Sequence, residues 1–270
     1  MTAAQPGGDD PKTRVELVAR TTAAVPGGTL ELGLHFEIDA GWHTYMPSQN
    51  DTGLPASAVW TLEVDGQPQQ DLQPGEIHWS AGHRYVLPGD ILDHVYEGST
   101  TPTTLLTLPE NLAGEWVRIV ADLEWLVCDS EQCLPEFGQV SLQLPIASTA
   151  EPSSHASLFA SAERARGVEM QGEAAGPVAI DLRAERATIT SEAAGRLTFL
   201  PDERSVYIKD LLTSGTSDRG FLMLRFERGE VAGDTPDTGE RLTGWIRFEP
   251  SHDDRTAAEP LLLRIDRPLP

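Results

Sequence analysis

The sequence predicts an all-β protein made of two tandem β-sandwich domains that a short helical connector joins. Two observations favour this fold class. Twenty prolines and 24 glycines punctuate the 270 residues, and between them short segments alternate polar with apolar residues, as strands with one buried face do. The chain is long enough, at 39% hydrophobic residues, to bury the cores of two ordinary domains.

The first domain is predicted over residues 13–147, after a disordered lead-in at residues 1–12 that is rich in Gly, Pro and Asp. Its clearest strands are segments in which apolar residues share one parity. These are residues 15–17, 30–38, 58–64, 117–127 and 140–144, with shorter candidates at 77–79, 95–98 and 103–108. Seven or eight short strands in about 130 residues are typical of an immunoglobulin-like sandwich.

Residues 148–167 differ in composition from the strands and predict the connector. Ser153 or Ser154 is placed to cap an alanine-rich helix over residues 155–166, which ends at Gly167. A second alternating series over residues 168–270 predicts another immunoglobulin-like β-sandwich domain, with a Gly-, Pro- and acid-rich loop at 228–241. This domain has no cysteine and a single histidine, His252, so we expect no chemistry from it alone.

The net charge of −22 and the pI near 4.5 argue against nucleic acid or an anionic membrane surface as a partner. No apolar run approaches the roughly 18 residues of a membrane span, so no span is expected. The polar N-terminus is no signal peptide, which leaves a cytosolic chain or one whose leader has been removed. A cysteine pair at disulfide spacing favours an oxidising compartment.

Cys128 and Cys133 are the two cysteines of the chain. They flank a four-residue segment between two alternating runs, which is a common length for a hairpin loop. In that geometry the two cysteines lie opposite each other, where antiparallel partners have Cα atoms roughly 4.5–5.5 Å apart. This separation permits a disulfide.

A disulfide at this position has two interpretations, a structural staple or a redox-active pair. Closing a loop of about six residues contributes only ~2 kcal/mol, against nearly 5 kcal/mol for a loop of about 100 residues. Hairpin disulfides nevertheless occur as staples, so a non-catalytic interaction domain is one alternative. Asp129 and Glu131 lie between the cysteines and should raise the thiol pKa values. Such a pair would accept a thiolate more readily than it would attack.

A second alternative is a soft-metal module, such as one for copper binding or copper tolerance. Cys128, Cys133, His43 and Met46 are the ligand types that Cu(I) prefers. No CxxC or HxxxH spacing supports a metal site, and no GxSxG motif indicates a hydrolase. We therefore expect neither a metal nor another cofactor.

Five short segments resemble a known family. They are Gly41-Trp42-His43-Thr44-Tyr45, Asp51-Thr52-Gly53-Leu54-Pro55, Val95-Tyr96-Glu97-Gly98, Trp125-Leu126-Val127-Cys128 and Cys133-Leu134-Pro135. In order and register, residues 14–146 resemble the N-terminal periplasmic domain of the DsbD/ScsB-type thiol–disulfide reductases. The remainder resembles the tandem domain of the ScsB-like branch more loosely.

The resemblance implies an immunoglobulin-like periplasmic module whose redox pair is Cys128 and Cys133. These would take electrons from a membrane donor and pass them to thioredoxin-like disulfide proteins. The family's membrane and thioredoxin-like domains are absent from this sequence, so the chain is expected to be either an excised piece of a longer protein or a stand-alone relative with an unknown donor. The family also places supporting residues at His43 and Tyr45, beside the disulfide, and at Val95, Tyr96 and Glu97, in a cap loop over the sulfurs.

The residues alone allow plainer roles for the same side chains. Tyr45 and Tyr96 would be ordinary core or surface aromatics, and His43, which follows a Trp at a strand end, would be structural. Trp42 and Trp125 are expected in the core, because a sandwich buries bulky residues.

Overall fold

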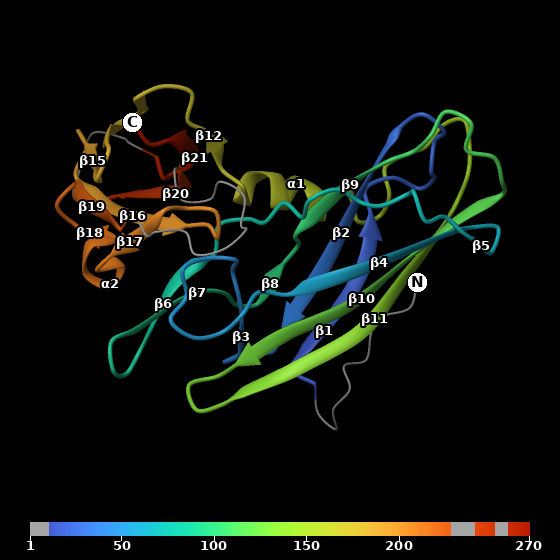
Figure 1. Cartoon of the computed structure of the whole chain (residues 1–270), viewed down its shortest axis with the longest axis horizontal. Coiled ribbons are helices and arrows are strands. Elements are labelled where there is room, and N and C mark those ends of the chain that lie inside the picture. The colour runs from blue at the N-terminus through green and yellow to red at the C-terminus, as the bar shows by residue number, and fades with distance from the viewer. Residues whose placement is uncertain (1–10, 228–240, 252–258) are drawn as a thin grey trace. The chain divides into compact units, whose positions relative to one another are not determined.

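The structure is a computed structural model that describes residues 11–227, 241–251 and 259–270 (Figure 1). Most of the predicted lead-in, nearly all of the predicted loop at 228–241, and His252 lie outside these residues. In the described part, all elements are strands except two short helices, α1 (Ala156–Ala165) and α2 (Leu211–Ser214). The predicted all-β fold is thereby confirmed. None of the described helices has the length and apolar character that crossing a membrane requires.

Contacts divide the chain into two compact units. The first comprises Met1–Tyr45, Leu54–Ser80 and Tyr96–Arg164, and the second comprises Met46–Gly53, Ala81–Val95 and Ala165–Pro270. Two segments from the first half of the sequence thus pack with the second half. Leu92 belongs to the apolar core of the second unit, and the Gln49 side chain is hydrogen-bonded to the backbone of Val206 and Ile208.

The first unit is a sandwich of two antiparallel sheets. In one, β2 (Thr29–Ile38) pairs with β1 (Thr13–Ala19), β8 (Ser99–Thr100) and β9 (Thr103–Thr107). In the other, β10 (Trp116–Cys128) lies between β11 (Cys133–Pro145) on one side and β4 (Ser57–Val64) and β3 (His43–Tyr45) on the other. The short β5 (Gln67–Pro68) extends β4 at the edge.

Alternation along β10 explains the core of this unit. Every second side chain from Val117 to Val127 is buried, as the sequence predicted. The Trp125 ring meets Phe36 edge to face at 5.7 Å, and its Nε1 donates to Glu136. Trp42 departs from the prediction, because it is only half-buried and the Lys12 ammonium lies over its ring.

The predicted helix is present as α1 and packs on the first unit. The Ser153 hydroxyl accepts a hydrogen bond from the backbone N–H of His155 at 3.1 Å, in the turn that leads into the helix. Phe159 is fully buried. Gly33 leaves room for its ring, because a Cβ at position 33 would come within 3.3 Å of it.

The second unit contains two five-stranded sheets, which form a second sandwich. One has the order β12 (Val168–Glu169), β21 (Leu261–Pro268), β20 (Arg241–Pro250), β16 (Gly195–Pro201) and β18 (Thr216–Ser217). The other has the order β13 (Ala174–Ala175), β14 (Val178–Arg183), β15 (Arg186–Ser191), β19 (Phe221–Glu227) and β17 (Tyr207–Lys209). The hairpin of β6 (His83–Leu87) and β7 (Ile91–Tyr96), apart from Tyr96, belongs to this unit.

Replacing Phe159 with alanine should lower the free energy of unfolding by about 3–5 kcal/mol, because a fully buried ring would leave a cavity. Urea unfolding followed by tryptophan fluorescence measures the change. Ser157 is exposed on the same helix, so Ser157→Ala should shift the free energy by less than about 0.5 kcal/mol. Equal effects of the two substitutions would contradict the packing of α1 on the first unit.

Candidate functional site

The β10–β11 hairpin carries both cysteines at its tip. Its register runs without a break through 13 residues of each strand, from Trp116 opposite Pro145 to Cys128 opposite Cys133. The two Cα atoms are 4.1 Å apart and the sulfurs are joined in a disulfide. The predicted hairpin, with the cysteines facing each other at the base of a four-residue loop, is confirmed.

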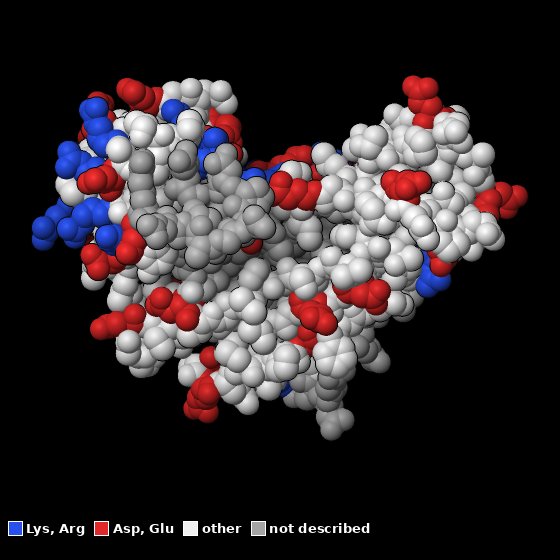
Figure 2. All heavy atoms as spheres, in the orientation of Figure 1, with Lys and Arg blue, Asp and Glu red and all other residues white. Residues whose placement is uncertain are grey.

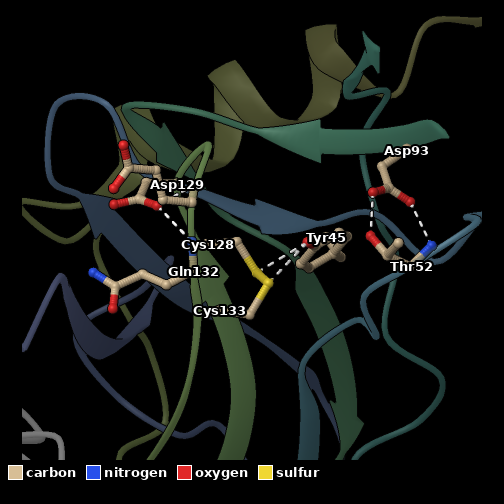
Figure 3. The surroundings of a disulfide bond; sticks show 8 residues. Tyr45, Thr52, Asp93, Cys128, Asp129, Gln132 and Cys133 are labelled. Atoms are coloured by element: carbon tan, nitrogen blue, oxygen red, sulfur yellow. Dashed lines mark hydrogen bonds between the residues drawn. A yellow bond between two sulfur atoms is a disulfide. The ribbon is translucent and has the colours of Figure 1, made fainter. Parts of the chain in front are cut away.

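Asp129 holds the loop between the cysteines in one conformation. Its Oδ1 accepts hydrogen bonds from the backbone N–H groups of Glu131 at 2.7 Å and Gln132 at 2.9 Å (Figure 3). Its own N–H donates to the Gln132 carbonyl. These bonds, first that from Glu131, lower the pKa of Asp129 below its ordinary value. Sequence reasoning considered only the charge of Asp129, although an Asp that opens a short loop is a signal for this kind of turn.

Strand β3 lies beside Cys128 on the side away from Cys133. His43 is the direct partner of Cys128, and Thr44 is the partner of Val127. Because side chains alternate along a strand, His43 and Tyr45 share the face that carries the cysteines. Their rings meet edge to face at 5.4 Å, and both side chains are buried.

The Tyr45 hydroxyl contacts the disulfide directly. It donates to Cys128 Sγ at 3.0 Å and lies 3.7 Å from Cys133 Sγ (Figure 3). A phenol at this distance can donate to a neutral sulfur, and it donates more strongly to a thiolate. Tyr45 is thus placed to stabilise negative charge that develops on Cys128.

The two cysteines differ in accessibility. Cys128 is 1% exposed, whereas Cys133 lies at the surface, followed by the half-buried Leu134 and the exposed Pro135. Solvent and a second protein can therefore approach the bond from the side of Cys133.

The residues of the expected cap loop lie in different surroundings. Val95 is fully buried and Glu97 is exposed. The Tyr96 hydroxyl donates to the Ser80 carbonyl at 2.7 Å, and its ring stacks on Trp79 at 6.3 Å. Burial raises the pKa of this phenol. These contacts hold Tyr96 against its own neighbours, and neither of them involves the sulfurs.

Within the second unit, carboxylates tie the segment at residues 50–52 to β7. Asp93 accepts hydrogen bonds from the backbone N–H and the hydroxyl of Thr52 (Figure 3). Asp51 accepts from the backbone N–H of Leu92, and Asn50 accepts from that of His94. Hydrogen bonds to β7 therefore hold Asp51 and Thr52, the first two residues of the Asp51–Pro55 segment that resembles the family.

The sulfur atoms of the candidate metal ligands are engaged in other interactions. Both sulfurs are in the disulfide and are not thiolates. Met46 is fully buried, and its Sδ accepts a hydrogen bond from the Gly82 N–H. In residues 11–227, 241–251 and 259–270, no group of three or more His, Cys, Asp and Glu side chains is arranged to hold a metal ion.

Comparison with known proteins agrees with the geometry of the hairpin. Residues 14–145 match the family described as "Thiol:disulfide interchange protein DsbD, N-terminal". The whole fold resembles the crystal structure of the N-terminal periplasmic domain of ScsB from Proteus mirabilis. The TM-score is 0.53 at 14% identity, over 99% of this chain and 98% of that one. At this identity the likeness concerns the fold alone.

A second solved structure, Spo0M, a sporulation control protein from Bacillus subtilis, is 10% identical over 95% of this chain and 91% of that chain. Its TM-score of 0.22 is too low to indicate a shared fold. No curated protein matches the chain by sequence.

The depressed pKa of Asp129 predicts the pH dependence of the loop. A carboxyl whose pKa is lower in the folded state contributes stability above its unfolded pKa, and that contribution is lost as the pH falls through the folded pKa. The amide NMR signals of Glu131 and Gln132 should therefore shift with a midpoint below the ordinary aspartate value. Asp129→Asn should abolish this transition, and a midpoint at or above the ordinary value would contradict the hydrogen bonding described.

Proposed function

Residues 14–145 match the DsbD N-terminal family, and from this premise we propose that the chain exchanges thiols and disulfides with partner proteins through Cys128 and Cys133. The observation that carries the proposal is the unequal surroundings of the two sulfurs. One cysteine lies at the surface, and the other is buried beneath a tyrosine hydroxyl. A bond that only pins two strands needs neither feature.

The sulfur of Cys133, the cysteine at the surface, is the point of attack. A partner thiolate forms a bond to Cys133 Sγ, the bond between the two sulfurs breaks, and its electron pair leaves on Cys128 Sγ. The Tyr45 hydroxyl, 3.0 Å away, stabilises that thiolate by donating a hydrogen bond. The partner's second thiolate then attacks its own sulfur in the mixed disulfide and releases Cys133. The partner is then oxidised, and the chain holds two reduced cysteines.

The reverse sequence passes the electrons on. Cys133, as a thiolate, attacks the disulfide of an acceptor and releases one of its sulfurs. Cys128 then attacks Cys133 Sγ, reforms the intrachain disulfide and releases the reduced acceptor. Every step is a thiolate–disulfide exchange, so no cofactor takes part. Asp129 and Glu131 place negative charge between the cysteines, which disfavours a thiolate there and so favours accepting a partner thiolate over attacking.

The other proposed site residues support this pair. His43 packs edge to face on Tyr45 and keeps its ring oriented toward the sulfurs. We assign Val95, Tyr96 and Glu97 to a cap that a partner displaces. The resemblance of Val95–Gly98 to the family supports this assignment.

The family also suggests the setting. We propose that residues 13–147 are the redox domain, that residues 148–167 connect it to a second domain at 168–270, and that the protein works outside the cytoplasm, in the periplasm. Its electron donor would be a membrane protein, and its acceptors would be thioredoxin-like proteins. The likeness to a periplasmic ScsB domain supports this setting by its fold.

Single cysteine variants test the direction of attack. Cys128→Ser leaves the exposed Cys133 free, so it should accumulate a mixed disulfide with a thioredoxin-like protein that carries one active-site cysteine. Cys133→Ser leaves only the buried Cys128 and should yield at least about tenfold less adduct under the same conditions. Non-reducing electrophoresis with mass spectrometry measures both.

The same experiment separates an exchange module from a structural staple. If neither variant forms an adduct and the reduction potential of the disulfide lies below about −300 mV, the bond is a staple. If Cys133→Ser, in which only Cys128 can react, forms more adduct than Cys128→Ser, the disulfide exchanges but the assigned point of attack is wrong.

Tyr45→Phe should slow reduction of the disulfide by dithiothreitol about tenfold, because the Cys128 thiolate loses its hydrogen-bond donor. It should also raise the pKa of the Cys128 thiol in the reduced protein, which thiolate absorbance reports. Tyr207→Phe is a matched control, since Tyr207 is 58% exposed in the second unit. Equal reduction rates for the two variants would contradict the proposal that Tyr45 stabilises the Cys128 thiolate.

A further inference from the structure

The second unit has a hollow of about 420 Å³ on the outer face of β20, β16 and β18. The apolar side chains of these strands, such as Leu197 and Phe248, point into the core. The residues between them point outward and line the hollow. Those that matter here are Arg196, Thr198, Thr216, Arg247 and Glu249, together with Arg84 from β6.

Hydrogen bonds hold Arg84 in place at this hollow. Its Nη1 donates to the Leu211 carbonyl at 3.0 Å and its Nη2 donates to the Leu212 carbonyl at 2.7 Å, both in α2. Gly215 makes room for the guanidinium, because a Cβ there would collide with Nη1. Burial lowers the pKa of Arg84. In the described part of the chain its hydrogen-bond partners are carbonyls, and none is a carboxylate.

Arg247 is held in the same manner. Its Nη2 donates to the Gly82 carbonyl at 2.7 Å, and burial lowers its pKa, an effect that the charge of Glu249 only partly offsets. On β16 and β18, the neighbouring Thr198 and Thr216 hydroxyls lie 3.1 Å apart. Two oriented guanidiniums and two hydroxyls therefore line one hollow.

The charge at the hollow contrasts with that of the whole chain. The chain has 42 acidic and 20 basic residues, whereas three arginines and two carboxylates, those of Asp218 and Glu249, line the hollow. Lys and Arg side chains also gather over β15 and β19, in the other sheet of this unit (Figure 2). At the rim, Arg196 is paired with Asp218 at 2.6 Å. Arg84 and Arg247 are desolvated with neutral hydrogen-bond partners, an arrangement that costs free energy unless an anion compensates it.

We propose that this hollow binds the oxyanion group of a small molecule, a carboxylate or a phosphate, between Arg84 and Arg247. The forked guanidinium matches both groups with paired N–H donors. The Thr216 hydroxyl donates to the Leu197 carbonyl, so the arginines are the donors that the proposal relies on. The volume lies in the range of sites for small organic ligands, so the oxyanion is one end of a larger molecule. The site uses neither cysteine and is independent of the exchange reaction.

Isothermal titration at constant ionic strength tests the site with two probes, inorganic phosphate and succinate. At least one should bind saturably to the folded protein, and the tighter probe identifies the preferred group. Arg84→Gln and Arg247→Gln should each weaken that binding at least about tenfold, which corresponds to about 1.4 kcal/mol. The double variant with Cys128→Ser and Cys133→Ser should bind as the wild type does.

Arg183→Gln is the matched control, because it removes the same charge from an exposed side chain that is paired with Asp181 in the same unit. Its affinity should equal that of the wild type. If it weakens binding as much as the Arg84 and Arg247 variants, the attraction is a general effect of charge and the site is refuted.

A measurement on the wild-type protein keeps the proposal testable if a variant fails to fold. Phenylglyoxal modifies arginine side chains, and peptide mass spectrometry follows each position. The tighter probe should slow modification of Arg84 and Arg247 and leave Arg183 unaffected. Equal protection of all three positions, or no saturable binding of either probe up to tens of millimolar, overturns the proposal.

Discussion

The unbroken antiparallel register between β10 and β11 is the constraint on which the candidate redox site depends (Figure 1). Because side chains alternate along both strands, a slip by one residue would bury the polar face and separate the cysteines. The buried face from Val117 to Val127 opposes such a slip. The packing of the first unit and the position of the disulfide are therefore consequences of one pairing.

Strand β3 turns this symmetrical hairpin into an asymmetric site. It pairs with β10 only at its end and places His43 and Tyr45 beside Cys128. One sulfur is then buried under a hydroxyl donor, while the other stays at the surface of the loop that Asp129 holds. In the exchange that we propose, this difference sets the direction, since a partner would reach one sulfur and the negative charge would develop on the other.

The hollow of the second unit and the hairpin tip of the first differ in the charged groups that they carry. The tip carries carboxylates, whereas the hollow over β20, β16 and β18 carries guanidiniums fixed by backbone carbonyls. Arg84 belongs to the residues that match the redox family, and Arg247 lies outside them. Their convergence shows that residues 81–95 also serve the second unit, where Leu92 contributes to the core.

The sequence by itself determined the all-β class, the helix near residue 156 and the facing cysteines, because alternation and loop length act locally. The resemblance to a family directed attention to His43 and Tyr45. Only the tertiary structure decided that Tyr45 donates to Cys128, that Lys12 lies over the half-buried Trp42, and that Arg84 and Arg247 line one hollow. These residues are 83, 30 and 163 positions apart in the sequence, and no local pattern records the packing that brings such distant residues to one place.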